Sequence, residues 1–416
     1  MKRLLSVTSF TALLSILRMC TGVIIAKIIA IYAGPAGMAM LGQIQSGIGI
    51  LNGIINAPLG SSIVRYTAEN SSDSFDKCAP WWRASIHWVV ILLLVIIPMG
   101  CLLSEELSVW LFNNDDYYWI IIIACWVLPF VAMNTLVTSV INGLQKYKIF
   151  VILGMVSNII STTIMIILIY NYNIKGALVA AVINNAVSGL VMILAVLRQP
   201  WFKLKYWWGK TETDNRKKIA SYMLMAITST LTVPVSMIII RNIMITNLGW
   251  EITGQWQAVW KISEVYLAVI TMSLGTYYLP KLSSLKNKNA IKNEIKKTAI
   301  IVMPIVILLA MCVYFFRDVA IHFLFTKEFS EARNLFALQL CGDVMKILSW
   351  LYAYPMLSSG AARWYIGSEL LFSFLLIILS WSLVPIYGAQ GANLAYLINY
   401  ILYFSFVFLN LSKFIK

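Results

Sequence analysis

The chain has 416 residues, of which 60% are hydrophobic and only 12% charged, and its mean hydropathy is +0.81. A soluble chain of this length needs far more charge to cover its surface, so the composition excludes a soluble globular protein. The formal net charge of +15 could suggest a nucleic-acid partner, but the distribution of the basic residues argues against that class.

Apolar stretches long enough to cross about 30 Å of hydrocarbon recur along the whole chain. The first follows a basic start and continues to Tyr32 without a convincing cleavage site, which predicts an uncleaved helix. The stretches lack the period-two alternation over about 10 residues that marks strands of an outer-membrane barrel. We therefore expect an all-α, polytopic membrane protein with twelve transmembrane helices. Their approximate ranges are 8–32, 39–64, 84–103, 118–141, 149–170, 176–197, 219–246, 255–280, 298–316, 334–357, 364–384 and 390–411.

The basic residues predict the orientation of these helices. When the connections are assigned alternately to two sides, one side carries 23 Lys and Arg residues and the other only 4. This bias predicts a membrane protein with both termini in the cytoplasm and an even number of spans. In this orientation the tract 201–218 is a basic cytoplasmic linker that faces the anionic leaflet, and we do not expect it to be a nucleic-acid site. We expect its Trp201, Trp207 and Trp208 to lie at the membrane interface.

The two halves of the chain resemble each other at nearly one offset. Four matches occur in the same order, with offsets of 214 to 217 residues: Lys27 with Arg241, Gly60 with Gly275, Gly143 with Gly360, and Gly176 with Gly391. The offset spans six helices, so the repeats have one orientation and their pseudo-twofold axis is expected along the membrane normal. This predicts six-helix lobes at 1–200 and 219–416, a cleft between them, and alternating access by rocking.

Charged residues within the expected helices are the main candidates for a binding site. On insertion scales each Lys or Arg at mid-bilayer costs roughly 2.5–3.5 kcal/mol, so such residues are expected to face water, partners or an anion. The spacing of Lys261 with Glu264, and of Asp343 with Lys346, allows each pair to form on one helical face. The cations outnumber the acids, which favours an anionic ligand. The cations are Arg18, Lys27, Arg241, Lys261 and Lys346, and the acids are Glu264, Asp343 and Glu369.

Neutral polar residues add to this picture. Gln45, Asn52 and Asn56 share a face of the second helix, where they could line a sugar path or form hydrogen bonds between helices. The chain carries no phosphate-binding loop, no nucleophile elbow and no zinc motif. We therefore expect no catalytic residue, no cofactor and no metal, and the chain is not expected to be an enzyme.

Three segments resemble the Wzx family of O-antigen and enterobacterial-common-antigen flippases, within the multidrug/oligosaccharidyl-lipid/polysaccharide exporter superfamily. They are YAGPAGMAMLGQ, GQWQAVWKISEVYLAVITMSLGTYYLPKLSSL and LFALQLCGDVMKILSWL. The resemblance implies export of an undecaprenyl-pyrophosphate-linked oligosaccharide to the periplasmic leaflet. It places Arg18, Lys27, Arg241 and the Asp343–Lys346 pair at charged positions of the family pattern, where the cations would meet the pyrophosphate. Membrane lipids, an O-antigen polymerase and a chain-length regulator are the implied partners.

Other functions fit the sequence less well. A multidrug exporter of the same superfamily would need acids for cationic drugs, and a lipid II flippase relative usually has two further helices. A membrane O-antigen polymerase would need long periplasmic loops, whereas the long loops here are expected in the cytoplasm. Glu264, Asp343 or Glu369 could couple transport to an ion gradient, because acids at membrane depth are usually functional.

Overall fold

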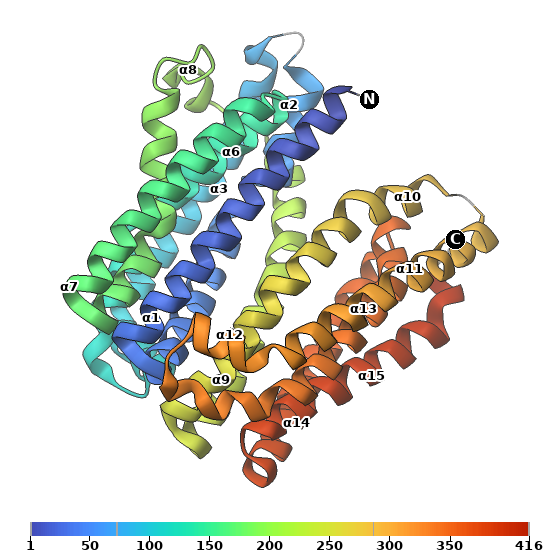
Figure 1. Ribbon diagram of the computed structural model, residues 1–416. Helices are drawn as coiled ribbons and strands as arrows, with labels where there is room; N and C mark the ends of the chain where they lie inside the picture. Colours follow the sequence, from blue (N-terminus) through green and yellow to red (C-terminus); the bar gives the residue numbers. More distant parts are fainter. Residues whose placement is uncertain (1, 72–73, 286, 415–416) are drawn as a thin grey trace. The chain divides into compact units, whose positions relative to one another are not determined.

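The computed structural model describes residues 2–71, 74–285 and 287–414, and these residues form helices and turns without a strand (Figure 1). Two compact units are present, one made of residues up to Tyr32 and Leu41–Val235, the other of Ala33–Met40 and Ser236–Lys416. The elements are α1 (Lys2–Asn56), α2 (Ser61–Asn70), α3 (Phe75–Leu102), α4 (Ser104–Phe112), η1 (Asp115–Tyr117), α5 (Tyr118–Trp126), α6 (Leu128–Gly143), α7 (Tyr147–Val196), α8 (Leu204–Trp207), α9 (Thr213–Ser273), η2 (Leu274–Tyr278), α10 (Leu279–Ser284), α11 (Lys288–Phe315), α12 (Arg317–Leu324), η3 (Lys327–Leu335), α13 (Phe336–Ser358), α14 (Ala362–Tyr387) and α15 (Ala389–Phe414).

The all-α polytopic class expected from the sequence is confirmed. Within the described ranges, nine helical stretches are long and apolar enough to cross a membrane. Three of them, in α1, α7 and α9, contain a residue with non-helical backbone angles, at Gly34, Asn173 and Gly249. Since each break divides one long helix into two, the structure is consistent with the twelve expected spans.

The internal repeat is visible in the backbone itself. Residues with positive φ recur in three pairs that are each 215 positions apart: Gly34 with Gly249, Gln145 with Gly360, and Asn173 with Gly388. The part of α7 after Asn173 and the helix α15 also begin in the same way. A Cβ at Gly176 would overlap the carbonyl of Leu168, and a Cβ at Gly391 would overlap the carbonyl of Leu383. These last pairs, too, are 215 positions apart.

This common offset corrects two of the sequence matches. Gly360 corresponds to Gln145 and not to Gly143, and Arg241 corresponds to Ala26, the neighbour of Lys27. The corrected register accounts for a difference in burial. Ala26 and Arg241 are both buried, whereas Lys27 is only half-buried.

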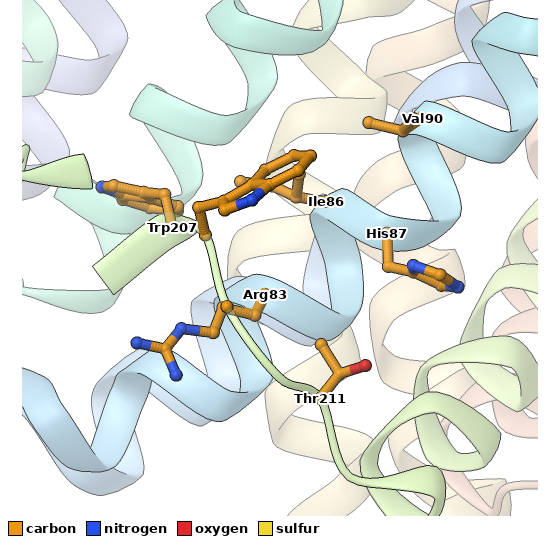
Figure 2. Close-up of a pocket in the computed structure, with 8 residues that line it drawn as sticks. Arg83, Ile86, His87, Val90, Trp207 and Thr211 are labelled. Carbon is orange, nitrogen blue, oxygen red and sulfur yellow. The ribbon is translucent and has the colours of Figure 1, made fainter. Parts of the chain in front are cut away.

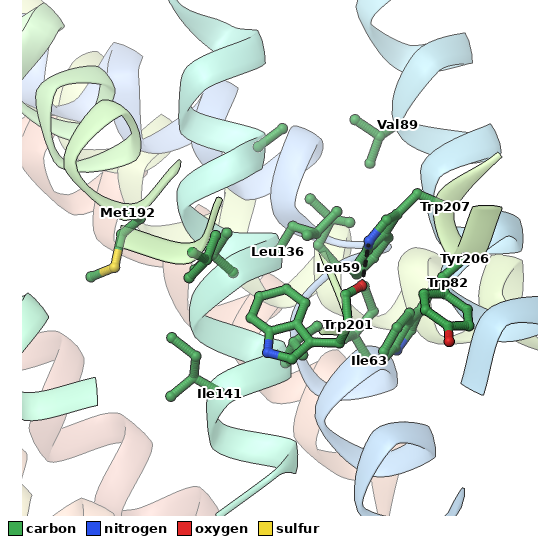
Figure 3. Packing of buried hydrophobic residues seen from close by; sticks show 14 of the residues in the cluster. Leu59, Ile63, Trp82, Val89, Leu136, Ile141, Met192, Trp201, Tyr206 and Trp207 are labelled. Atoms are coloured by element: carbon green, nitrogen blue, oxygen red, sulfur yellow. Dashed lines mark hydrogen bonds between the residues drawn. The ribbon is translucent and has the colours of Figure 1, made fainter. Parts of the chain in front are cut away.

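The core of the first unit contains a group of stacked aromatic side chains among aliphatic ones. Trp82 of α3 stacks on Trp207 of α8 with ring centroids 4.4 Å apart, and Trp201 meets both rings edge-on (Figure 3). The indole of Trp207 donates a hydrogen bond to the carbonyl of Trp201 at 3.0 Å. Trp201 and Trp207 are therefore core residues and not interfacial ones as the sequence suggested, while Trp208 is exposed. The tract 201–208 is thus packed onto α3.

In the second unit, α13 packs against α11 and α15, and α14 packs against α15 (Figure 1). The approach of α13 and α15 depends on Gly342, because a Cβ at this position would overlap the ring of Tyr396. A glycine is required here for its small size, since its backbone is helical. This close approach places the residue after it, Asp343, beside α15.

Candidate functional site

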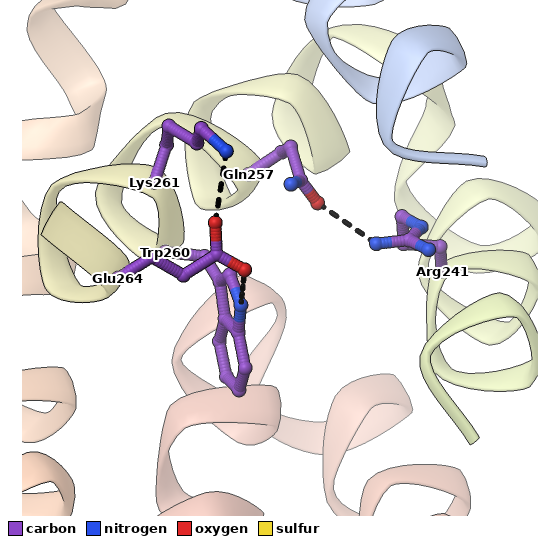
Figure 4. A network of polar contacts seen from close by, with 5 residues as sticks. All are labelled: Arg241, Gln257, Trp260, Lys261 and Glu264. Carbon is purple, nitrogen blue, oxygen red and sulfur yellow. Dashed lines mark hydrogen bonds and ion pairs between the residues drawn. The ribbon is translucent and has the colours of Figure 1, made fainter. Parts of the chain in front are cut away.

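Arg241 is the most deeply buried basic side chain that the structure describes, with an exposed fraction of 2%. It lies in the first half of α9, and its Nη1 donates a hydrogen bond to Oε1 of Gln257, 3.0 Å away in the second half (Figure 4). Glu264 acts on it electrostatically. A hydrogen bond to a charged group contributes about 1.5–3 kcal/mol, so the amide helps to hold the guanidinium inside the protein. A neutral amide does not cancel its charge.

One turn further along α9, Lys261 and Glu264 form the predicted i, i+3 ion pair. Their Nζ and Oε2 atoms are 3.0 Å apart, and Trp260 donates its indole hydrogen to Oε1 of the same carboxylate at 3.2 Å (Figure 4). The carboxylate of Glu264 is half exposed. An exposed pair of this kind contributes at most about 1 kcal/mol to stability, so it leaves both groups available to a ligand.

Asp343 is fully buried, with an exposed fraction of 0%. Its carboxylate accepts hydrogen bonds from the hydroxyl of Tyr266 at 2.7 Å, the hydroxyl of Tyr396 at 3.0 Å and the amide of Gln339 at 3.3 Å. The sequence suggested an ion pair with Lys346, but no such pair occurs among the described residues. Neutral donors from α9, α13 and α15 satisfy this carboxylate instead.

Lys346 lies among aromatic rings. Its Nζ is 5.1 Å from the ring centroid of Trp350 and 5.8 to 5.9 Å from those of Trp260, Tyr396 and Tyr400. Each distance is within the roughly 6 Å at which a cation is attracted by the face of a ring. Three acids, Asp343, Glu264 and the half-buried Glu369 of α14, act on it electrostatically.

These contacts, together with the electrostatic action of Glu369 of α14 on Lys346, form one polar cluster within the second unit. We call it the α9–α13–α15 cluster after the helices that supply its other residues. Trp260 touches Glu264 on one side and packs on Tyr396 at 5.1 Å on the other. The cluster brings together every charged residue that the sequence predicted in this half of the chain, and it is formally balanced. Its cations are Arg241, Lys261 and Lys346, and its acids are Glu264, Asp343 and Glu369.

The remaining predicted residues lie on α1 in the first unit. Arg18 and Gln45 are exposed, and Lys27 is half-buried. The side-chain oxygens of Asn52 and Asn56 are buried, and no hydrogen bond to either oxygen is found among the described residues. Buried amide oxygens normally have a partner, so these two are well placed to accept hydrogen bonds from water or from a polar ligand.

Sequence reasoning missed the aromatic side chains and amides that hold the charges. Tyr266, Trp350, Tyr396, Tyr400 and Gln339 give no signal of their own, because aromatic residues are common in membrane helices. The one available hint is the spacing of Tyr396 and Tyr400, which places both on the same face of a helix. Their contact with Asp343 and Lys346, more than 45 positions away, is a tertiary feature.

Comparison with known proteins gives a consistent result. Residues 4–286 match the family described as "Polysaccharide biosynthesis protein". The lipid III flippase of Escherichia coli (strain K12) is 27% identical over 404 residues, which cover 95% of each chain, and the protein of the same name from Shigella flexneri matches equally well.

Solved structures share the fold at lower sequence identity. The lipid II flippase MurJ in an inward closed conformation has a TM-score of 0.73 and 16% identity, over 98% of this chain and 87% of that one. An inward-facing multidrug resistance transporter of the MATE family, in the MOP superfamily, has a TM-score of 0.72 and 16% identity over 95% of each chain. Both comparisons extend over nearly the whole of this chain.

Proposed function

The chain belongs to the polysaccharide biosynthesis protein family, and from this premise we propose that it is a flippase for a lipid-linked oligosaccharide. The observation that carries the proposal is the relationship, along nearly the whole length of both chains, to a lipid III flippase. The buried, charged cluster in a chain of membrane-spanning helices supports transport rather than catalysis. The substrate is an undecaprenyl-pyrophosphate-linked O-antigen repeat unit, moved across the bacterial inner membrane.

In this proposal the cations engage the pyrophosphate. Arg18 and Lys27 supply the excess positive charge, because the α9–α13–α15 cluster is formally balanced while these two residues have no acid in their own helix. Arg241 is the strongest candidate in the second half, since it is a deeply buried guanidinium whose Nη1 is held by the neutral amide of Gln257. Lys261 and Lys346 can exchange their contacts with acids and aromatic rings for a phosphate oxygen. Gln45, Asn52 and Asn56 would contact the sugars.

Energy coupling is assigned to the acids. Glu264 is paired with Lys261 and also acts on Arg241 and Lys346, so its protonation would alter the field at three cations together. Asp343 and Glu369 also act on Lys346. A change in net charge of this kind alters anion affinity, which is what coupling to an ion gradient requires.

The topology that goes with this function has lobes at 1–200 and 219–416, both termini in the cytoplasm and a basic cytoplasmic linker at 201–218. Alternating access by rocking of the lobes would carry the pyrophosphate and sugars, while the lipid tail stays in the bilayer. An O-antigen polymerase and a chain-length regulator are candidate partners. Reporter fusions at each terminus and within 201–218 would test the orientation.

The direct test is transport in proteoliposomes. The substrate is an undecaprenyl-pyrophosphate sugar that carries a fluorophore, and bleaching by an impermeant reductant reports which leaflet it occupies. We expect Arg241→Gln and Lys27→Gln to slow translocation at least tenfold, because each removes a charged contact to the pyrophosphate. Arg65→Gln is the matched control, since Arg65 is exposed and paired with Glu69.

Equal rates for the wild type and for both cation variants would refute the role of the cations. Wild-type protein that moves none of this substrate but exports a cationic dye would favour the multidrug alternative.

A further inference from the structure

A small cavity lies in the first unit, between α3 and the end of α8 with the segment that follows it (Figure 2). Its volume is about 110 Å³. One wall is a single face of α3, formed by residues spaced as i, i+3, i+4 and i+7: Arg83, Ile86, His87 and Val90. The other wall is formed by Trp207, Trp208, Gly209 and Thr211. The volume is several times the roughly 10–15 Å³ that one water molecule needs, so a phosphate-sized group fits.

The polar lining of this cavity is suited to an anion. Arg83 donates through one Nη to the carbonyl of Lys205, while its Nε is buried and forms no hydrogen bond within the described part of the chain. The backbone of Gly209 lies against the guanidinium, because a Cβ there would be only 3.1 Å from Cζ of Arg83. The side chains of His87 and Thr211 provide further hydrogen-bond donors, and no acid is among the described lining residues.

The surroundings of the cavity indicate a lipid rather than a free ion. After Val90 in the chain, the surface of α3 continues as an exposed apolar strip that includes Ile91, Leu94 and Val95. Leu94 is 69% exposed. Beside the cavity, Trp208 is 67% exposed. Exposed tryptophan next to basic residues is typical of the membrane interface, where rings lie at headgroup level.

We propose that this cavity binds the phosphate of an anionic membrane phospholipid, whose acyl chains lie along the α3 strip. Arg83 is the main phosphate contact, since a guanidinium forms charge-assisted hydrogen bonds to phosphate oxygens. Lys210, an exposed neighbour in the chain, adds to the positive field at the entrance. The site is independent of the α9–α13–α15 cluster, which lies in the other unit, and of the proposed substrate.

The experiment uses the full chain in detergent and counts lipid adducts by native mass spectrometry. Phosphatidylglycerol and phosphatidylethanolamine with identical acyl chains are compared, and we expect phosphatidylglycerol to bind preferentially. Arg83→Gln should weaken its binding about tenfold. Arg198→Gln is the matched control, because Arg198 is exposed in the same unit and does not line the cavity, and it should change binding less than twofold.

Arg83→Gln also removes the hydrogen bond to Lys205 in the linker, so a second variant separates loss of the site from misfolding of the linker. Val90→Trp places a bulky ring in the cavity without removing the hydrogen bond from Arg83 to Lys205, and it should also abolish the preference for phosphatidylglycerol. Equal losses in Arg83→Gln and Arg198→Gln, or equal binding of the two lipids, would overturn the proposal. Displacement of phosphatidylglycerol by millimolar inorganic phosphate would support a phosphate site but overturn its assignment to a lipid.

Discussion

The contact between α13 and α15 at Gly342 provides the sharpest test of how the candidate site is built. A methyl group added by Gly342→Ala would overlap the ring of Tyr396, whose hydroxyl donates to Asp343. Overpacking of a close contact typically costs 1–3 kcal/mol. Replacement of a helical glycine by alanine also gains roughly 0.5–1 kcal/mol from helix propensity, which partly conceals this cost.

Gly367→Ala separates the two effects. Gly367 is a helical glycine of α14, and a Cβ there would meet no atom within 4 Å. Both substitutions gain the same helix propensity, so the difference in stability between the two variants isolates the overlap with Tyr396. We expect Gly342→Ala to be less stable than Gly367→Ala by about 1–3 kcal/mol.

The assay is thermal unfolding of the detergent-purified protein, followed by the loss of monodisperse material in size-exclusion chromatography. If Gly342→Ala melts at or above the temperature of Gly367→Ala, the proposed packing of α13 on α15 is wrong. A double-mutant comparison strengthens the test. In a Tyr396→Leu background the ring is absent, so Gly342→Ala should then cost much less than it does in the wild type.

Two further predictions concern the first unit and use the same unfolding assay. Trp207→Ala should destabilise by about 3–5 kcal/mol because Trp207 is buried and stacked on Trp82, whereas Trp208→Ala should stay within about 0.5 kcal/mol because Trp208 is exposed. Equal effects would contradict the core shown in Figure 3. Gln145→Gly should stabilise by about 1 kcal/mol, since Gln145 has a φ of 55° where its repeat partner is Gly360. A loss of stability there would mean that the Gln145 side chain makes a contact worth more than the relieved strain.

Much of the fold could be predicted because the relevant signals are local. Hydropathy over about 20 residues is enough to identify a membrane span, so the expected helices agree with the spans and breaks observed. The ion pair of Lys261 and Glu264 was also predictable, since residues three apart on a helix are neighbours whatever the rest of the chain does. The repeat could be found from matched residues, but its common offset of 215 emerged only from the backbone angles.

By itself the sequence determined which residues are charged in an apolar environment and must therefore find a partner. Only the tertiary structure decided what those partners are. Asp343 is held by Tyr266 and Tyr396 and not by Lys346, because the small Gly342 lets α15 approach α13 closely enough for a tyrosine hydroxyl to reach the carboxylate. Such contacts depend on the distance between helices far apart in the chain, and no local periodicity encodes that distance.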